Sequence, residues 1–163
     1  MVRFTRLTLL SFAVILFAGL GVVVFDVQQN QVRHRDEQRR KDVSYILDRI
    51  ELYAKENNAV PSFPSELQQI GTASENCGLS TNACQVNITS CFSLNNIMNN
   101  RELSLPSDVS IGSYYKTGYA VRFDPQKEVV TIVACGTERG EVISDSRELH
   151  TLLVPRKARN VQK

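Results

Sequence analysis

An uninterrupted apolar stretch, Leu7 to Phe25, constrains this chain more than any other part of its sequence. Its 19 residues carry no charge, and Arg6 and Asp26 close its two ends. A helix of this length rises about 28 Å, close to the thickness of the hydrocarbon core of a bilayer. The stretch is longer than a signal-peptide core, and no clear cleavage pattern follows it. We therefore expect one uncleaved membrane anchor, with a signal peptide cut near Ala18 or Gly21 as the alternative.

Charged residues divide the 163-residue chain into three parts. Residues 1–25 form a basic leader and the anchor, residues 26–148 contain all 17 acidic side chains, and residues 149–163 form a basic tail that we expect to be disordered. The net charge of +2 averages these parts and gives no reason to expect a nucleic-acid partner. Arg3 and Arg6 favour a cytoplasmic N-terminus, although the bases between Arg33 and Lys41 oppose it.

Four cysteines, Cys77, Cys84, Cys91 and Cys135, all follow the anchor. An even number in a small domain is typical of two disulfides, and hence of an extracytoplasmic location at a bacterial envelope or cell surface. Of the three possible pairings we favour Cys77–Cys84 as a local loop and Cys91–Cys135. The spacings are wider than those of zinc sites, so we expect no metal.

The segment Val27–Asn57 contains neither Gly nor Pro and predicts the continuation of the anchor as one helix from Leu7 to Asn57. The part Val27–Asp42 is too polar to be packed much, so we expect a solvated connecting helix. The following turns carry an apolar stripe at helical spacing that we expect to pack on a core. Its residues are Val43, Ile46, Leu47, Ile50, Tyr53 and Ala54.

The middle of the chain predicts short elements and loops. We expect a short helix over Pro64–Ile70 and a crosslinked loop over Thr72–Asn87. A second short helix is expected over Phe92–Met98, followed by a turn at Leu105–Asp108.

The last third has the alternating pattern of β-strands. Ser113–Phe123 and Glu128–Cys135 flank the turn sequence Asp124–Lys127 and predict a hairpin, with a third strand over Glu141–Asp145. The fold class is therefore α+β, a long N-terminal helix packed against a small antiparallel sheet. Since neighbouring strand residues face opposite sides, we expect one of Tyr114 and Tyr115 in the core and the other exposed.

The order of these elements, with Tyr53–Pro61 followed by Pro64–Ile70, resembles the type IV pilin and pseudopilin family. The resemblance implies a structural or accessory subunit of a type IV pilus or of a filament like that of type II secretion. Its partners would be the bilayer, through residues 7–25, and like or related subunits, through the N-terminal helix. The sequence departs from the family pattern because no acidic residue precedes Asp26, so we expect the leader not to be processed.

The alternative function is a non-polymerising, single-pass anchored module that binds an unidentified surface ligand. We expect no enzyme and no cofactor, because the sequence has no nucleophile elbow, HExxH, P-loop or CxxC motif. His34 and His150 are expected at the surface, as are the scattered acids Glu138, Glu141, Asp145 and Glu148. Asp108 and Asp124 are expected to be turn residues.

Overall fold

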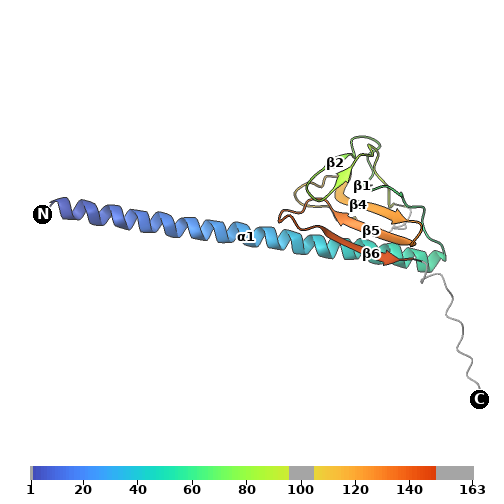
Figure 1. Cartoon of the computed structure of the whole chain (residues 1–163), viewed down its shortest axis with the longest axis horizontal. Helices are drawn as coiled ribbons and strands as arrows, with labels where there is room; N and C mark the ends of the chain where they lie inside the picture. Colours follow the sequence, from blue (N-terminus) through green and yellow to red (C-terminus); the bar gives the residue numbers. More distant parts are fainter. Residues whose placement is uncertain (1, 96–104, 150–163) are drawn as a thin grey trace, which may run out of the picture. The chain divides into compact units, whose positions relative to one another are not determined.

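The computed structural model describes residues 2–95 and 105–149, with side chains from residue 26 onward. The elements, in chain order, are α1 (Val2–Asn57), β1 (Gln68–Gly71), β2 (Leu79–Ser80), β3 (Gln85–Val86), β4 (Lys116–Asp124), β5 (Val129–Ala134) and β6 (Ile143–Glu148). The chain divides into two compact units, Met1–Arg35 and Asp36–Lys163 (Figure 1). The first unit is helical from Val2, and the second contains the rest of α1 and all the strands.

Helix α1 ends at Asn57, as the sequence predicts. Asn58 has a φ of 48°, a left-handed conformation that commonly follows the last residue of a helix. The Ala59 N–H then donates to the Ala54 carbonyl at 3.3 Å. The side chains of residues 7–25 lie outside the described part of the chain. Within the part whose side chains are described, no helix is long and apolar enough to cross a membrane.

The main sheet has four antiparallel strands in the order β1-β4-β5-β6. The predicted hairpin is confirmed, with Tyr119 opposite Ala134 and Asp124 opposite Val129. Asp124 is a turn residue as expected, since its carboxylate accepts the N–H groups of Gln126 and Lys127. The third strand is also present, but β6 begins later and runs further than the predicted Glu141–Asp145.

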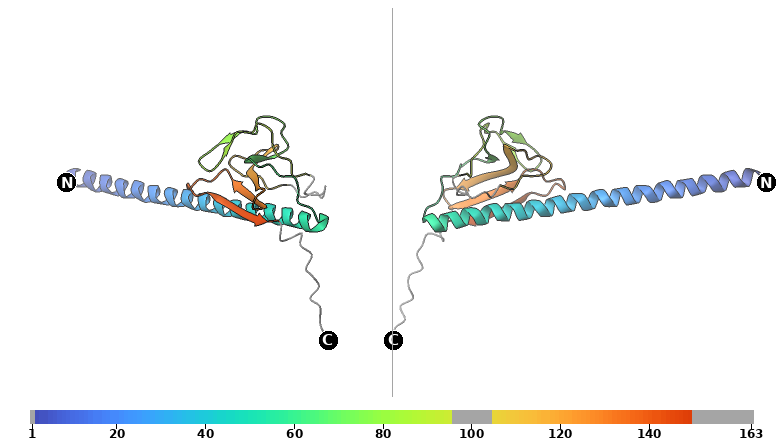
Figure 2. Two further views of the ribbon diagram at one scale, coloured as in Figure 1. Left: turned by 45° about the vertical axis from the view of Figure 1, so that its right-hand side comes forward. Right: turned by 180° about the vertical axis from the view of Figure 1, so that it is seen from behind.

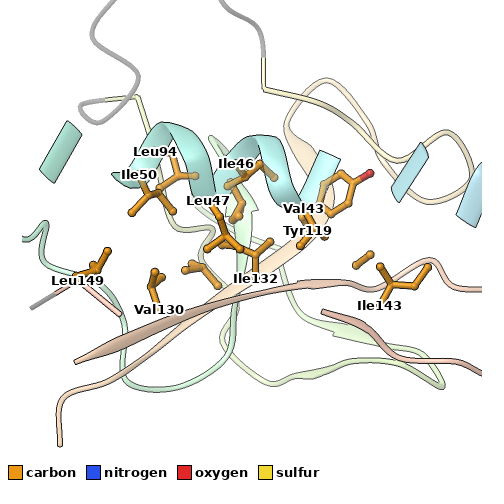
Figure 3. Close-up of a cluster of buried hydrophobic side chains, with 13 residues drawn as sticks. Val43, Ile46, Leu47, Ile50, Leu94, Tyr119, Val130, Ile132, Ile143 and Leu149 are labelled. Atoms are coloured by element: carbon orange, nitrogen blue, oxygen red, sulfur yellow. The ribbon is translucent and has the colours of Figure 1, made fainter. Parts of the chain in front are cut away.

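The core lies between the last turns of α1 and one face of the sheet, and Figures 1 and 2 show this packing from several directions. The predicted stripe is confirmed, because Val43, Ile46, Leu47, Ile50 and Ala54 are buried. Figure 3 shows the stripe meeting the side chains of β4, β5 and β6. Tyr53 is half-buried and packs on the edge of this cluster. Each buried aliphatic side chain contributes about 1.5–3 kcal/mol by leaving water.

Leu149 belongs to the same core, so the expected domain boundary at residue 148 is too early. Its side chain is fully buried, and its N–H donates to the Glu128 carbonyl at 3.0 Å. The remainder of the expected disordered tail, 150–163, and His150 with it, lie outside the described residues.

The helix predicted over Pro64–Ile70 is wrong, because Gln68–Gly71 forms strand β1. Gln68 lies opposite Val121 of β4, and the Pro64 carbonyl accepts the Phe123 N–H at 2.8 Å. A helix of seven residues is marginal on its own, so pairing with the open edge of β4 decides the conformation.

The second short helix, Phe92–Met98, is also wrong where the structure describes it. Phe92 makes a parallel bridge to Ile70, with its N–H donating to the Gln69 carbonyl at 2.8 Å. Ile97 and Met98 lie outside the described residues. The predicted loop Thr72–Asn87 contains the small β2–β3 hairpin. The turn expected at Leu105–Asp108 comes later, over residues 109–111.

Candidate functional site

Two disulfides hold the loops of the domain, as the even cysteine count predicts, but the favoured pairing is wrong. The bonds are Cys77–Cys91 and Cys84–Cys135. The second bond ties the β2–β3 hairpin to the end of β5, where the Thr81 hydroxyl also donates to the Cys135 carbonyl at 2.8 Å. Cys84 therefore packs over the sheet with Val86 and Ala120 rather than closing a local loop.

A charge cluster joins α1 to two distant loops; Arg39, Asp36 and Asp108 are its buried members, and Ser110 and Glu138 lie at its more exposed edge. Nε of Arg39 donates to Oδ2 of Asp108 at 2.5 Å, and Nη1 donates to Asp36 at 2.7 Å. Nη2 reaches Ser110 at 2.7 Å and Glu138 at 3.2 Å. The Arg39 side chain is only 2% exposed and that of Asp108 0% exposed. All three nitrogens of the guanidinium thus have partners, which come from three parts of the chain.

Electrostatics favour the charged forms in this cluster. Burial lowers the pKa of Arg39, but its hydrogen bonds to Asp108 and Asp36 outweigh burial and raise that pKa above its ordinary value. Burial likewise raises the pKa of Asp108, yet hydrogen bonds from Arg39 and Ser110 lower it to about 2. Both groups are therefore ionised at neutral pH, as an ion pair requires.

Asp108 also organises the backbone around it. Its Oδ1 accepts the N–H groups of Ser110 and Ile111, so it is a turn residue as expected as well as an ion-pair partner. Gly136 lies so close that an added Cβ would stand 2.6 Å from Oδ2 of Asp108. A side chain at that position would push the carboxylate away from Arg39.

A second contact between α1 and the sheet, which is partly buried, lies beside the cluster. The Tyr119 hydroxyl, from β4, donates to Oδ2 of Asp42 on α1 at 2.5 Å. Burial and this hydrogen bond raise the pKa of Tyr119, so the phenol stays neutral. The contact fixes the helix to the central strands of the sheet.

The prediction of a solvated connecting helix is therefore wrong at Asp36 and Arg39, which are 5% and 2% exposed. The sequence held a signal for Arg39. Arg39 precedes Val43 by four residues and Ile46 by seven, so it continues the buried stripe. A charged residue at a stripe position indicates a buried partner, although the sequence does not identify Asp108 as that partner.

Two adjacent tyrosines form an exposed aromatic pair, contrary to the expected core and surface split. Tyr114 is 91% exposed and Tyr115 is 58% exposed. Both residues precede β4, which begins at Lys116, so the alternation of strand residues does not apply to them. Beside them is a cavity of about 670 Å³, lined by Gly71, Thr72, Asn95, Leu105, Pro106, Ser107, Ser113, Tyr114, Tyr115 and Thr117.

The remaining candidate residues lie apart from one another. His34 is exposed, as expected. Glu141 pairs with Arg40 at the surface at 2.9 Å, and Asp145 pairs with Arg147 at 2.8 Å. Among residues 26–95 and 105–149 no group of three or more His, Cys, Asp or Glu side chains is arranged to hold a metal ion. Comparisons of the chain with protein-family models, with curated proteins and with solved structures give no match.

Proposed function

We propose that this protein is a pilin-like structural or accessory subunit of a type IV pilus or a secretion-type filament. The observation that carries the proposal is the packing of the stripe from Val43 to Ala54 on a four-stranded antiparallel sheet. An uncharged stretch, Leu7–Phe25, precedes this stripe in the same helix α1. The resemblance of Tyr53–Ile70 to type IV pilins and pseudopilins links this arrangement to a function in filaments.

In this proposal the apolar stretch has two environments. Residues 7–25 lie in the bilayer before assembly, because exposing a continuous apolar surface to water costs about 25 cal/mol per Å². In the filament the same residues pack against the corresponding helices of like or related subunits. The subunit acts through helix packing and through contacts of its surface loops, without catalysis.

The two disulfides support an extracytoplasmic place for the folded domain. Disulfides persist in oxidising compartments, and Cys77, Cys84, Cys91 and Cys135 are all paired. The N-terminus would then be cytoplasmic, with the domain at the bacterial envelope or cell surface.

A second candidate function is an anchored binding module that does not polymerise. One sequence observation favours it, since the first acidic residue is Asp26. Pilins are thought to use an acidic side chain near the start of the helix to neutralise the terminal amine of a neighbouring subunit. This sequence offers no such residue within the apolar stretch.

Photo-crosslinking distinguishes the two functions. We would replace Leu16, in the middle of the apolar stretch, with a photoreactive phenylalanine analogue and co-produce two forms of the full chain that carry different epitope tags. A subunit of a filament gives ladder bands that contain both tags after irradiation. An anchored monomer gives no band with both tags, and that result would reject the proposed function in favour of the second one.

A further inference from the structure

The aromatic pair of Tyr114 and Tyr115 is the least expected feature of the surface. The two rings meet edge to face, with centroids 4.9 Å apart and planes at 89°. Neither ring belongs to either core cluster of the domain. Tyrosine rings held on a surface supply a rigid contact area with one polar end, which is typical of recognition sites.

The cavity beside the pair has the size and composition of a small-ligand site. Its volume of about 670 Å³ falls within the usual range of ligand pockets. Leu105 and Pro106 provide apolar walls, and the hydroxyls of Thr72, Ser107 and Ser113 add polar groups. None of the described residues that line it carries a formal charge, although charged residues make up 22% of the sequence.

Some backbone groups at this cavity are engaged already. The N–H groups of Thr72 and Ala73 both donate to the Tyr115 carbonyl, at 2.9 and 3.4 Å. Ser113 and Lys116 exchange hydrogen bonds through their main chains, at 2.6 and 3.3 Å.

The Thr117 hydroxyl at the cavity donates to the Ile70 carbonyl at 2.8 Å, whereas other hydroxyls of the lining are not engaged in this way. Within the described part of the chain, no side-chain hydrogen bond involves the hydroxyls of Ser107, Ser113 or the two tyrosines. These hydroxyls can donate or accept, so they match a ligand that carries many hydroxyls of its own.

We propose that this cavity binds an uncharged saccharide. The apolar C–H faces of a sugar ring pack against the exposed tyrosine rings, whose faces carry partial negative charge. The sugar hydroxyls exchange hydrogen bonds with Ser107 and Ser113. A charged ligand would lack an opposite charge among the described residues of the lining. The site is independent of filament assembly, so an anchored module would bind the same class of ligand.

Fluorine NMR on the full chain tests the proposal. The sequence has five tyrosines, so labelling with 3-fluorotyrosine gives one signal for each. The variants Tyr114→Phe and Tyr115→Phe assign the two signals at the cavity, and Tyr45, Tyr53 and Tyr119 serve as internal controls. The ligands are maltotriose, cellotriose and chitotriose at millimolar concentrations, in a phosphocholine detergent because sugar-based detergents would compete.

We expect at least one trisaccharide to shift the Tyr114 and Tyr115 signals saturably and to leave the other three unchanged. The Ser107→Ala and Tyr114→Ala variants should each weaken binding, by about tenfold for the loss of the ring. Val142→Ser, which changes another exposed apolar residue, is the control and should bind normally. The proposal is overturned if no trisaccharide shifts the two signals, if all five signals shift together, or if only an acidic oligosaccharide or a proline-rich peptide shifts them.

Discussion

Arg39 and Asp108 form an ion pair across 69 positions of sequence, with Nε and Oδ2 2.5 Å apart. Arg39 belongs to α1, and Asp108 precedes the turn that leads into β4. Both side chains are at most 2% exposed. The pair therefore fixes the loop beside the sheet to the helix, and it sets where the cavity-lining residues that follow Asp108 can lie.

Loss of the Arg39 charge should destabilise the domain strongly. Arg39→Met leaves Asp108 and Asp36 buried without their cation, and breaking such a pair typically costs about 3–5 kcal/mol. The matched control is Arg40→Met, whose residue is paired with Glu141 at the surface and half exposed. It should cost less than about 1 kcal/mol. Urea denaturation of both variants measures the difference, and equal costs would contradict the structural role of Arg39.

The ion pair should also make stability depend on pH. The pKa of Asp108 is about 2 in the folded protein, below its ordinary value of 3.8. A lowered carboxyl pKa stabilises the fold above the unfolded pKa, and this contribution of about 2 kcal/mol is lost as pH falls from about 5 toward 2. The stability difference between the wild type and Asp108→Asn should therefore shrink over that range. A difference that stays constant from neutral pH to pH 2 would show that Asp108 does not titrate as described.

The disulfide pairing can be read directly from a peptide map. Non-reducing digestion and mass spectrometry should give linked peptides for Cys77–Cys91 and for Cys84–Cys135. Because the second bond closes the longer loop, with a separation of 51 residues against 14, its removal should cost more. The chain-entropy relation gives about 4 kcal/mol for the Cys84/Cys135 double serine variant and about 3 kcal/mol for Cys77/Cys91. Linked peptides in the pairing Cys77–Cys84 would refute this assignment.

Two leucines on α1 differ in burial and so test which face of the helix meets the core. Leu47 is fully buried, whereas Leu52 is 40% exposed. Leu47→Ala should cost about 2–5 kcal/mol in unfolding free energy, because it leaves a cavity between α1 and the sheet. Leu52→Ala removes the same atoms from the surface and should cost less than about 1 kcal/mol. If both variants lose similar stability, the orientation of the helix on the sheet is different from the one described.

Local sequence patterns were sufficient to predict those elements whose structure is determined by their own residues. The stripe from Val43 to Ala54 and the alternation in β4 and β5 each carry their period in consecutive residues. These residues are buried because the apolar face of the helix and the apolar face of the sheet pack against each other. The turn at Asp124 is equally local, since its carboxylate binds the N–H groups that follow it.

The failures share a long-range cause. The local pattern around Gln68–Gly71 favours a helix, but the segment becomes a strand because β4 offers an open edge. Cys84 pairs with Cys135 because the β2–β3 hairpin lies over the end of β5, which no spacing reveals. Asp108 lies in an ordinary turn sequence, and only the folded chain brings it to Arg39.

The most direct measurement of the proposed function is to shear the producing cells and locate the full-length protein. We predict recovery in the sheared filament fraction, with the intact mass showing that residues 1–21 are still present. Leu47→Ala serves as a folding control, since a destabilised domain should reduce recovery without changing the mass. Recovery of the wild-type protein only in membranes would contradict a filament subunit and would favour the anchored binding module.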